Sequence, residues 1–224
     1  MDSGPFPTDG NLLPAAESAG SAVPRRSVLV GSERLLVECG DMLRDQGHVI
    51  AAVVSDAPVV ADWAKRHGFA LLGRIADLPA AGIAPFDYLF SIANLRILSP
   101  AVLAMPRRLA INFHNGPLPD YAGVNAPSWA LMAGEARYGI SWHVATAEVD
   151  GGDLLATAAV DIEPDDTALT LNAKCFDAAA RSFAPLVRAL EDPNFRPTPQ
   201  AGGPKRFFGL EARPADAGLI DLAA

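Results

Sequence analysis

Cysteine and long apolar runs are both scarce in this sequence. The 224 residues include two cysteines, Cys39 and Cys175, which lie far apart and lack the spacing of metal ligands. Both fall in apolar, helix-like segments, which favours buried thiols in a reducing compartment over a disulfide. No apolar run approaches the length of a membrane span, and no secretory signal is evident. The sequence therefore predicts a cytoplasmic protein without a membrane partner and without a metal.

Positive charge is also in deficit. The formal net charge is −8, which argues against a nucleic-acid partner held mainly by phosphate contacts. The single basic stretch, PKRFF at 204–208, is interpreted as a solvated loop. No Gly-x-Gly-x-x-Gly segment occurs anywhere in the chain, and this absence weakens any assignment as a dinucleotide-dependent enzyme.

Most of the chain alternates between apolar strands and amphipathic helices. Near-continuous apolar strands between helices predict a parallel sheet covered on both faces. Beyond Gly134 two long strands joined by an acidic turn predict a β-rich extension, and a long helix follows with Asp165 or Asp166 as its N-cap. The fold class is therefore α/β, with a Rossmann-like, mostly parallel sheet. Strands are expected at 27–32, 48–55, 69–72, 87–92, 108–114, 138–146 and 152–162, and helices at 33–47, 58–68 and 165–192. The apolar stripe of the last helix is expected to include Leu169, Phe176, Ala180, Phe183, Val187 and Leu190.

A cluster of polar side chains follows the apolar strand in AINFHNGPLPDYAG, residues 110–123. Asn112 and His114 are two positions apart, so both side chains face the same side of a strand. Pro117 and Pro119 stiffen the chain that leaves the strand. Ligands of open α/β sheets bind at the carboxyl ends of strands, which makes this cluster a candidate site. The alternative is an Asn and a His satisfied by neighbouring backbone groups.

A carboxylate in the following segment could complete such a site. Asp150 lies in AEVDGGDLL, between two expected strands and just before two glycines. A carboxylate beside His114 would orient its ring and stabilise its protonated form. The alternative for Asp150 is an ordinary Asp-Gly turn.

These motifs resemble those of the folate-dependent formyltransferases, a family that includes methionyl-tRNA formyltransferase and glycinamide ribonucleotide transformylase. INFHNGPLPDYAG followed by EVDGGDLL is similar to the family's Asn-x-His, Leu-Pro-x-Tyr-x-Gly and Asp signature. LRILSP at 95–100 is similar to a pterin-side loop, and KRFFG and RPADAGLID to the segment that closes the catalytic domain. The stretch 116–143 most resembles formyltransferase domains of nonribosomal peptide and polyketide synthases.

The resemblance implies a donor and a set of site residues. The donor would be 10-formyltetrahydrofolate, a co-substrate, and the catalytic groups would be Asn112, His114 and Asp150. His143, in SWHV, is a further site candidate, with a satisfied strand histidine as the alternative. Pro117, Leu118 and Tyr121 would shape the rim. The folate-binding positions implied are Ile92, Leu95, Arg96, Ile97, Leu98, Val149, Gly151 and Asp153.

The same resemblance sets expectations for the acceptor and for the domains. The family's usual SLLP is GPLP at 116–119, and the transformylase's glycine-rich phosphate loop is replaced by VGSERL at 30–35. Glycinamide ribonucleotide is therefore not the expected acceptor. We expect a flexible leader at 1–24, a catalytic domain at 25–200 and a closing segment at 201–224 that links to further chain in a larger multidomain protein. The acceptor would be an aminoacyl group on a carrier protein. Alternatives are an amino-sugar nucleotide, water in a formyltetrahydrofolate hydrolase, and an inactive docking domain.

Overall fold

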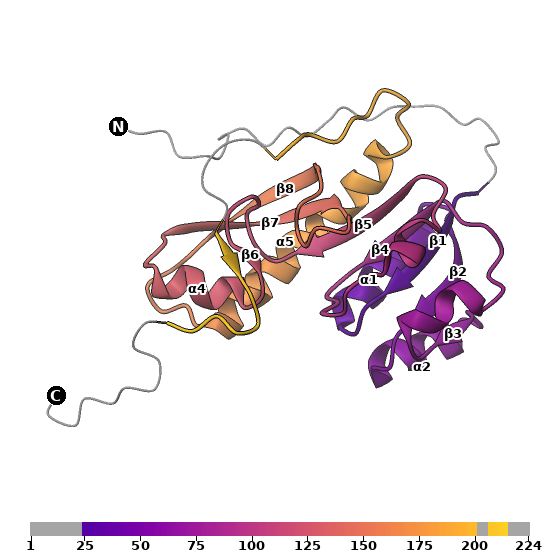
Figure 1. The fold of residues 1–224 in the computed structure, drawn as a ribbon, viewed down its shortest axis with the longest axis horizontal. Coiled ribbons are helices and arrows are strands. Elements are labelled where there is room, and N and C mark those ends of the chain that lie inside the picture. The colour runs from indigo at the N-terminus through magenta and orange to yellow at the C-terminus, as the bar shows by residue number, and fades with distance from the viewer. Residues whose placement is uncertain (1–23, 201–205, 215–224) are drawn as a thin grey trace, which may run out of the picture.

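The computed structural model describes residues 24–200 and 206–214 (Figure 1). The leader predicted at 1–24 lies outside the described residues except for Pro24, and the segment predicted at 201–224 is described at 206–214 alone. No helix within these described ranges is long and apolar enough to cross a membrane. Cys39 and Cys175 are free and buried, as predicted.

One seven-stranded sheet organises the chain, in the order β3-β2-β1-β4-β5-β7-β8. The first five of these strands are parallel to one another. Strand β7 then pairs antiparallel with β5, and β8 pairs antiparallel with β7. The predicted fold class, including the β-rich extension, is therefore confirmed. The strands are β1 (Arg26–Val30), β2 (Val49–Val54), β3 (Leu71–Leu72), β4 (Tyr88–Ser91), β5 (Leu109–His114), β7 (Arg137–Val144) and β8 (Leu154–Asp161).

Helices cover the two faces of this sheet unequally. One core cluster contains side chains of α1 (Arg34–Asp45), α2 (Pro58–Arg66), α4 (Ala126–Met132) and α5 (Ala168–Ala189). The other face is covered by two short elements, the 3₁₀ helix η1 (Ile75–Ala80) and α3 (Pro100–Leu103). This thinner cover leaves room for a site on the second face. A separate pair of parallel strands, β6 (Ala122–Gly123) and β9 (Phe207–Phe208), lies near α4 (Figure 1).

The predicted ends of α1 and α2 are confirmed, whereas the predicted start of α5 is wrong. Gly47 and Gly68 follow α1 and α2 with φ of 81° and 70°, a conformation that glycine adopts without steric cost. The predicted N-cap of α5 is wrong, because Thr167 caps the helix through the Thr170 backbone N–H. Asp166 instead accepts hydrogen bonds from Thr170 Oγ1 and Lys174.

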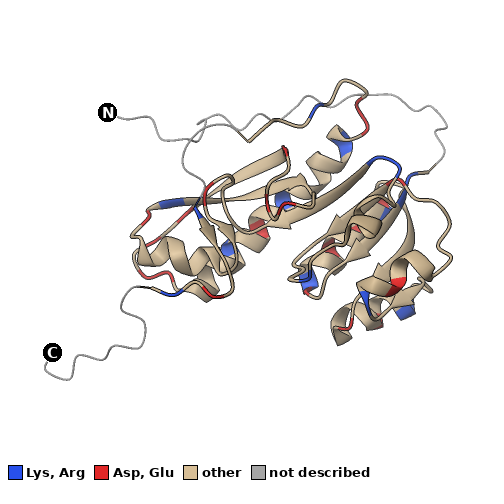
Figure 2. Cartoon of the chain, viewed as in Figure 1, with Lys and Arg blue, Asp and Glu red and all other residues tan. Residues whose placement is uncertain are grey.

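The predicted apolar stripe of α5 is partly wrong. Phe183 and Val187 are buried, but Leu169 is 78% exposed. The buried face is formed by Leu171, Cys175, Ala178, Ala179, Phe183, Leu186 and Val187. Charged residues of both signs are interspersed along the described part of the ribbon (Figure 2).

Candidate active site

Strand alternation separates the core from the site on β5. Ile111 and Phe113 belong to the larger core cluster, whereas Ala110 faces the second side of the sheet. Asn112 and His114 share the side of Ala110 because side chains alternate along a strand. On the neighbouring strands, Ser91 of β4 and His143 of β7 are both in register with Asn112. The thinly covered face therefore carries a row of polar side chains where β4 and β5 end.

His143 contacts Asn112 directly across the strand pair. Its Nε2 lies 3.1 Å from Asn112 Nδ2, and its Nδ1 lies 2.9 Å from the Val144 carbonyl oxygen. A carbonyl only accepts, so Nδ1 carries a proton, and Nε2 lies within reach of both the Asn112 amide and the Asp150 carboxylate. The β7–β8 register shifts between Trp142 and His143, and such irregularities re-aim side chains beside functional sites.

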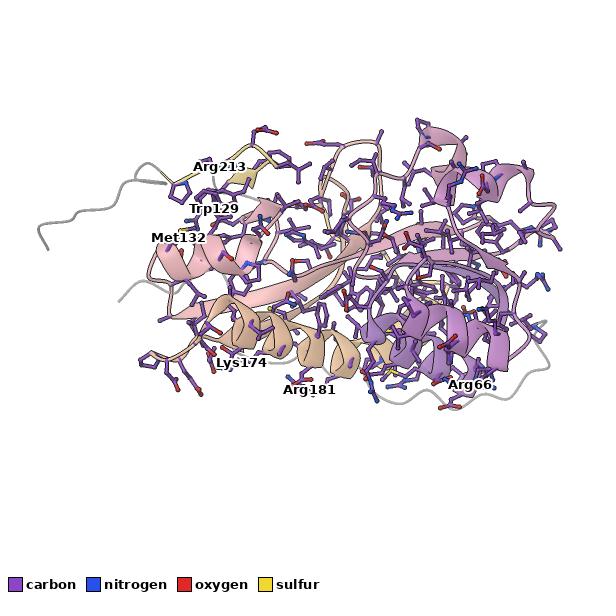
Figure 3. All side chains as sticks on the ribbon, turned by 90° about the horizontal axis from the view of Figure 1, so that it is seen from below. Arg66, Trp129, Met132, Lys174, Arg181 and Arg213 are labelled. Carbon is purple, nitrogen blue, oxygen red and sulfur yellow. The ribbon has the colours of Figure 1, made fainter. Side chains whose placement is uncertain are left out.

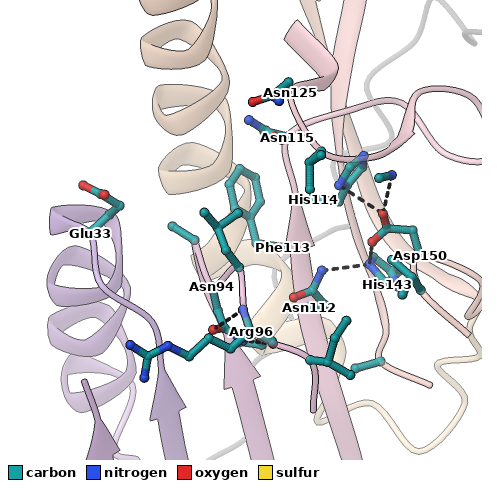
Figure 4. A pocket seen from close by; sticks show the side chains of 18 of the residues that line it. Glu33, Asn94, Arg96, Asn112, Phe113, His114, Asn115, Asn125, His143 and Asp150 are labelled. Atoms are coloured by element: carbon teal, nitrogen blue, oxygen red, sulfur yellow. Dashed lines mark hydrogen bonds and ion pairs between the residues drawn. The ribbon is translucent and has the colours of Figure 1, made fainter. Parts of the chain in front are cut away.

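Asp150 lies between the two histidines (Figure 4). Its Oδ1 is 3.4 Å from His143 Nε2, and its Oδ2 is 3.6 Å from His114 Nδ1. The Gly123 N–H donates to Oδ2 at 2.8 Å. Burial alone would raise the pKa of Asp150, but His143, the positive form of His114 and the Gly123 N–H together hold that pKa below its ordinary value. Asp150 is therefore an ionised carboxylate at neutral pH.

His114 is buried next to the Tyr121 carbonyl. Its Nε2 lies 2.8 Å from the Tyr121 carbonyl oxygen, which can only accept, so Nε2 carries a proton. Burial lowers the pKa of His114 and outweighs the opposing effect of the Asp150 carboxylate. The resting ring is therefore neutral, with an unprotonated Nδ1 facing Asp150. His114 can therefore accept one proton at Nδ1, where the Asp150 carboxylate stabilises the resulting positive charge.

The cluster opens into a cavity of about 580 Å³. One side of the cavity comes from the loop after β4 and the loop between β7 and β8, with Leu95 and Val149 among its residues. The other side comes from the starts of α1, α4 and α5, with Glu33, Asn125 and Asn172. Four exposed apolar side chains, which we call the apolar rim, line this cavity: Leu95, Ile97, Val149 and Leu169.

Backbone strain in the described chain gathers at this site. Its four non-glycine residues with positive φ are Ala93, Tyr121, Asn125 and Asp150, at 49°, 55°, 56° and 53°. Three of them line the cavity, and the carbonyl of Tyr121 holds His114. Left-handed backbone at non-glycine residues persists only where the surroundings enforce it, and it clusters at functional sites.

The structure brings most of the predicted site residues to the cavity. Asn112, His114, Asp150 and His143 meet there, together with five of the folate-binding candidates: Leu95, Arg96, Ile97, Leu98 and Val149. The remaining candidates do not line it. Ile92 is fully buried in the core, the Asp153 carbonyl accepts from the Val144 N–H, and the Gly151 N–H donates to the Glu148 carbonyl.

The three predicted rim residues lie behind the site. Pro117, Leu118 and Tyr121 do not line the cavity. The Ser141 hydroxyl accepts from the Leu118 N–H and donates to the Gly116 carbonyl, which fastens the turn beneath His114. The Tyr121 hydroxyl donates to Glu135 at 2.6 Å. These residues support the site from its outer side.

Residues on the far side of the cavity escape sequence reasoning. Asn125 precedes α4 as its N-cap but makes no capping hydrogen bond, and Asn115 donates to Asn172 Oδ1 at 2.7 Å. An Asn just before an Ala-Pro helix start is an ordinary capping signal. Its left-handed backbone and its place at the cavity are visible only in three dimensions.

A polar cluster at strand ends beside a cavity defines an enzyme of the open-sheet α/β class. The fold is shared with glycinamide ribonucleotide transformylase 1 from Symbiobacterium toebii at 23% identity and a TM-score of 0.66, over 77% of this chain and 92% of that one. An N-formyltransferase from Helicobacter canadensis matches at 15% identity and a TM-score of 0.70, over 84% and 71%. HypX from Aquifex aeolicus matches at 18% identity and a TM-score of 0.67, over 85% of this chain and 30% of the HypX chain.

At these identities the structural likeness establishes the fold. The sequence of the site segment adds separate evidence, because residues 84–187 match the family model described as formyl transferase. That segment contains the predicted group Asn112, His114 and Asp150. The predicted resemblance to the formyltransferases is therefore confirmed over residues 84–187.

Proposed function

We propose that this protein transfers a formyl group from 10-formyltetrahydrofolate to a primary amine. The observation that carries the proposal is the convergence of Asn112, His114 and Asp150 on one cavity within the family segment. The same cluster without an adjoining cavity would support only a structural role. Because Asn112, His114 and Asp150 are all present, an active transferase is favoured over a docking domain.

Each group has a defined task in this reaction. The amine nitrogen bonds to the formyl carbon, the bond from that carbon to folate N10 breaks, and N10 takes up the proton that the amine loses. Negative charge develops on the formyl oxygen, where the Asn112 amide would donate a hydrogen bond and the positive ring of protonated His114 would add electrostatic stabilisation. Asp150, kept ionised by its neighbours, would stabilise the protonated ring of His114 while the proton moves.

The donor would occupy the side of the cavity formed by the loop after β4. Leu95 and Ile97 are 90% and 71% exposed there, an arrangement that suits a flat aromatic ring. The Asn94 side chain accepts from the Arg96 N–H and donates to the Arg96 carbonyl, so the backbone of this loop is held in place. The Helicobacter canadensis protein is described in complex with folinic acid, and HypX with tetrahydrofolic acid. Both descriptions support a folate as the donor.

For the acceptor we propose an aminoacyl group tethered to a carrier protein. Arg96 is the one Lys or Arg among the described residues that line the cavity, and it forms an ion pair with Asp56. The far side instead presents amides and the Glu33 carboxylate. An acceptor bound through phosphate groups would lack a cationic partner there. A tethered acceptor needs little affinity of its own because tethering raises its effective concentration.

The segment around 206–208 gives the amino-sugar nucleotide alternative little support. Arg206 is paired with Asp120 and Glu135. Phe208 stacks on Trp129 with ring centroids 4.5 Å apart. Neither Arg206 nor Phe208 lines the cavity. The aromatic and basic wall that a nucleotide would require is therefore occupied by contacts within the protein.

Two experiments test this function. In the first, the protein is incubated with 10-formyltetrahydrofolate and with aminoacyl-carrier thioesters, amino-sugar nucleotides or no amine, and products are analysed by mass spectrometry. We expect one added formyl group on the carrier-bound amine. Formylation of the sugar alone would overturn the acceptor proposal, and formate release that no amine alters would identify a hydrolase.

The second experiment measures thermal protection by folate. A ligand at about 100 times its Kd stabilises the native state by about 2.7 kcal/mol. We expect Leu95→Ser to weaken this protection. Leu210→Ser is the matched control, because Leu210 is 79% exposed and does not line the cavity. Equal protection of both variants would contradict the placement of the donor.

A further inference from the structure

Residues 121–123 hold two of the three groups in the proposed mechanism. The Tyr121 carbonyl accepts from His114 Nε2 at 2.8 Å, and the Gly123 N–H donates to Asp150 Oδ2 at 2.8 Å. Because the carbonyl fixes the proton on Nε2, the ring can exchange its other proton only at Nδ1, the atom facing Asp150. The position of this short segment therefore sets both the tautomer of His114 and the orientation of Asp150.

The backbone of this segment pairs with a strand far away in the sequence. Among the described residues, strand β6 pairs with β9 alone, through hydrogen bonds from Ala122 N–H to the Arg206 carbonyl at 2.9 Å and from Val124 N–H to the Phe208 carbonyl at 2.8 Å. The fit is close: a Cβ on Gly123 would lie 2.1 Å from the Phe208 carbonyl oxygen. Strand β9 and Arg206 thus fix the backbone around Gly123. They lie outside the family match, which ends at residue 187.

Arg206 fastens β9 to β6 by its side chain. Its guanidinium binds both carboxylate oxygens of Asp120 and lies 3.2 Å from Glu135. The same group lies over the Tyr121 ring, 4.1 Å from its centroid. The Tyr121 hydroxyl also donates to Glu135, so one arginine closes a ring of contacts around the strained Tyr121 backbone.

Aromatic packing on the outer side completes the attachment. Phe208 stacks between Trp129 and Tyr121, at 4.5 Å and 5.9 Å between ring centroids. Figure 3 shows Trp129 and Met132 of α4 beside the yellow segment that carries Arg213. These contacts seat β9 against α4.

We propose that Arg206, through β9 and β6, is a positioning residue that holds His114 and Asp150 in their working geometry. This inference rests on the proposed formyl transfer. It assigns to the segment 206–208 a role in turnover that is separate from folding. The side chain of Arg206 touches neither the cavity nor any group of the site, so its effect must pass through the Tyr121 carbonyl and the Gly123 N–H.

The test compares Arg206→Met, Arg206→Lys and the control Arg213→Met. Arg213 lies in the same described stretch, 206–214, and its guanidinium donates to the nearby carbonyls of Leu210 and Ala212. We expect Arg206→Met to lower kcat by up to about 100-fold, the cost of a small misplacement of reacting groups, with KM for the folate donor little changed. Arg206→Lys should fall between, because lysine keeps the charge without the two-pronged geometry.

A second readout is independent of turnover. The ring protons of His114 are titrated by NMR in folded wild-type and variant protein, with His114→Gln used for assignment. We expect Arg206→Met to move the His114 titration and Arg213→Met to leave it in place. If wild type formylates no amine, the proposed function fails and this titration still decides the positioning role. An unchanged titration in Arg206→Met, or a kcat loss that only matches the unfolded fraction, would overturn the inference.

Discussion

The carboxylate of Asp150 faces His143 as closely as it faces His114, with 3.4 Å from Oδ1 to His143 Nε2. The motif resemblance pairs Asp150 with His114 and gives His143 a secondary place. The structure instead makes His143 the bridge between Asp150 and Asn112, because the same Nε2 lies 3.1 Å from the Asn112 amide. His143 therefore bears on two groups of the proposed mechanism at once.

Replacing His143 with Ala should move the acid limb of the pH profile. Hydrogen bonding to His143 is one of the effects that lower the pKa of Asp150, so its loss raises that pKa. Asp150 then becomes protonated at a higher pH, and the acid limb of kcat/KM shifts upward. The profile is measured alongside His67→Ala, an exposed histidine after α2. An acid limb that stays in place would contradict this role.

Replacing Asn112 or His114 with Ala should reduce formyl transfer by about 100- to 1000-fold, the usual loss when one group that stabilises the oxyanion is removed. Single-turnover kinetics with saturating donor isolate the chemical step. Asn194→Ala, an exposed asparagine after α5, serves as the control. Folding is followed by circular dichroism and the Tm. A variant with near-normal turnover would show that the strand-end cluster is structural.

Replacing Gly116 with Ala should impair catalysis by displacing His114. A Cβ at this position would lie 2.6 Å from His114 Nε2 and 3.0 Å from the Tyr121 carbonyl oxygen. The ring must then shift away from the carbonyl that fixes its tautomer. We expect kcat to fall by about 10- to 100-fold with little change in the KM of the donor.

Gly73→Ala provides the matched control for this substitution, because no atom lies within 4 Å of a Cβ there. Full activity in Gly116→Ala would mean that the ring tolerates displacement. That result would remove the link between the tautomer of His114 and turnover.

Stability should decrease as the pH falls below about 6.5, the ordinary histidine pKa. Burial lowers the pKa of both His48 and His114 in the folded protein. Between the folded and unfolded pKa values, the unfolded chain binds protons that the folded chain does not, so the free energy of unfolding declines with falling pH. Urea denaturation across this range measures the slope.

His48→Gln should flatten part of that slope, because the glutamine cannot titrate. His48 lies away from the cavity, and its Nδ1 contacts Ser27 Oγ at 2.9 Å. Activity should be retained in the same variant. An identical slope in wild type and His48→Gln would show that His48 does not contribute to the pH dependence.

The parts of the fold that depend on local periodicity were predictable from sequence. The central strands and the first two helices follow directly from apolar patterning, and glycines mark the ends of the two helices. The prediction for α5 was wrong at Leu169, which lines the cavity. Helical spacing of an apolar residue does not distinguish a core position from a position that lines a cavity. The capping error arose because Asp166 and Thr167 are both good N-caps.

The site was predictable in its residues and less so in its geometry. Asn112, His114 and Asp150 stand out because polar groups at strand ends are chemically unusual. The contact between His143 and Asn112 depends on the register of two antiparallel strands, and the support of Gly123 depends on pairing with a strand more than eighty residues away. Neither a register nor a long-range pairing leaves a local pattern in the sequence.

The pairing of β5 with β7 divides the site into a fixed part and an adaptable part. Asn112 and His143 face each other because the backbone ladder puts them there, so no substitution in a loop can separate them. Asp150 and Asn125 instead sit on connecting segments. In the proposed reaction, changes in loops could therefore reshape the acceptor side of the cavity while the strand-borne pair Asn112 and His143 is retained. One scaffold of this kind can diversify among amines without reinventing its chemistry.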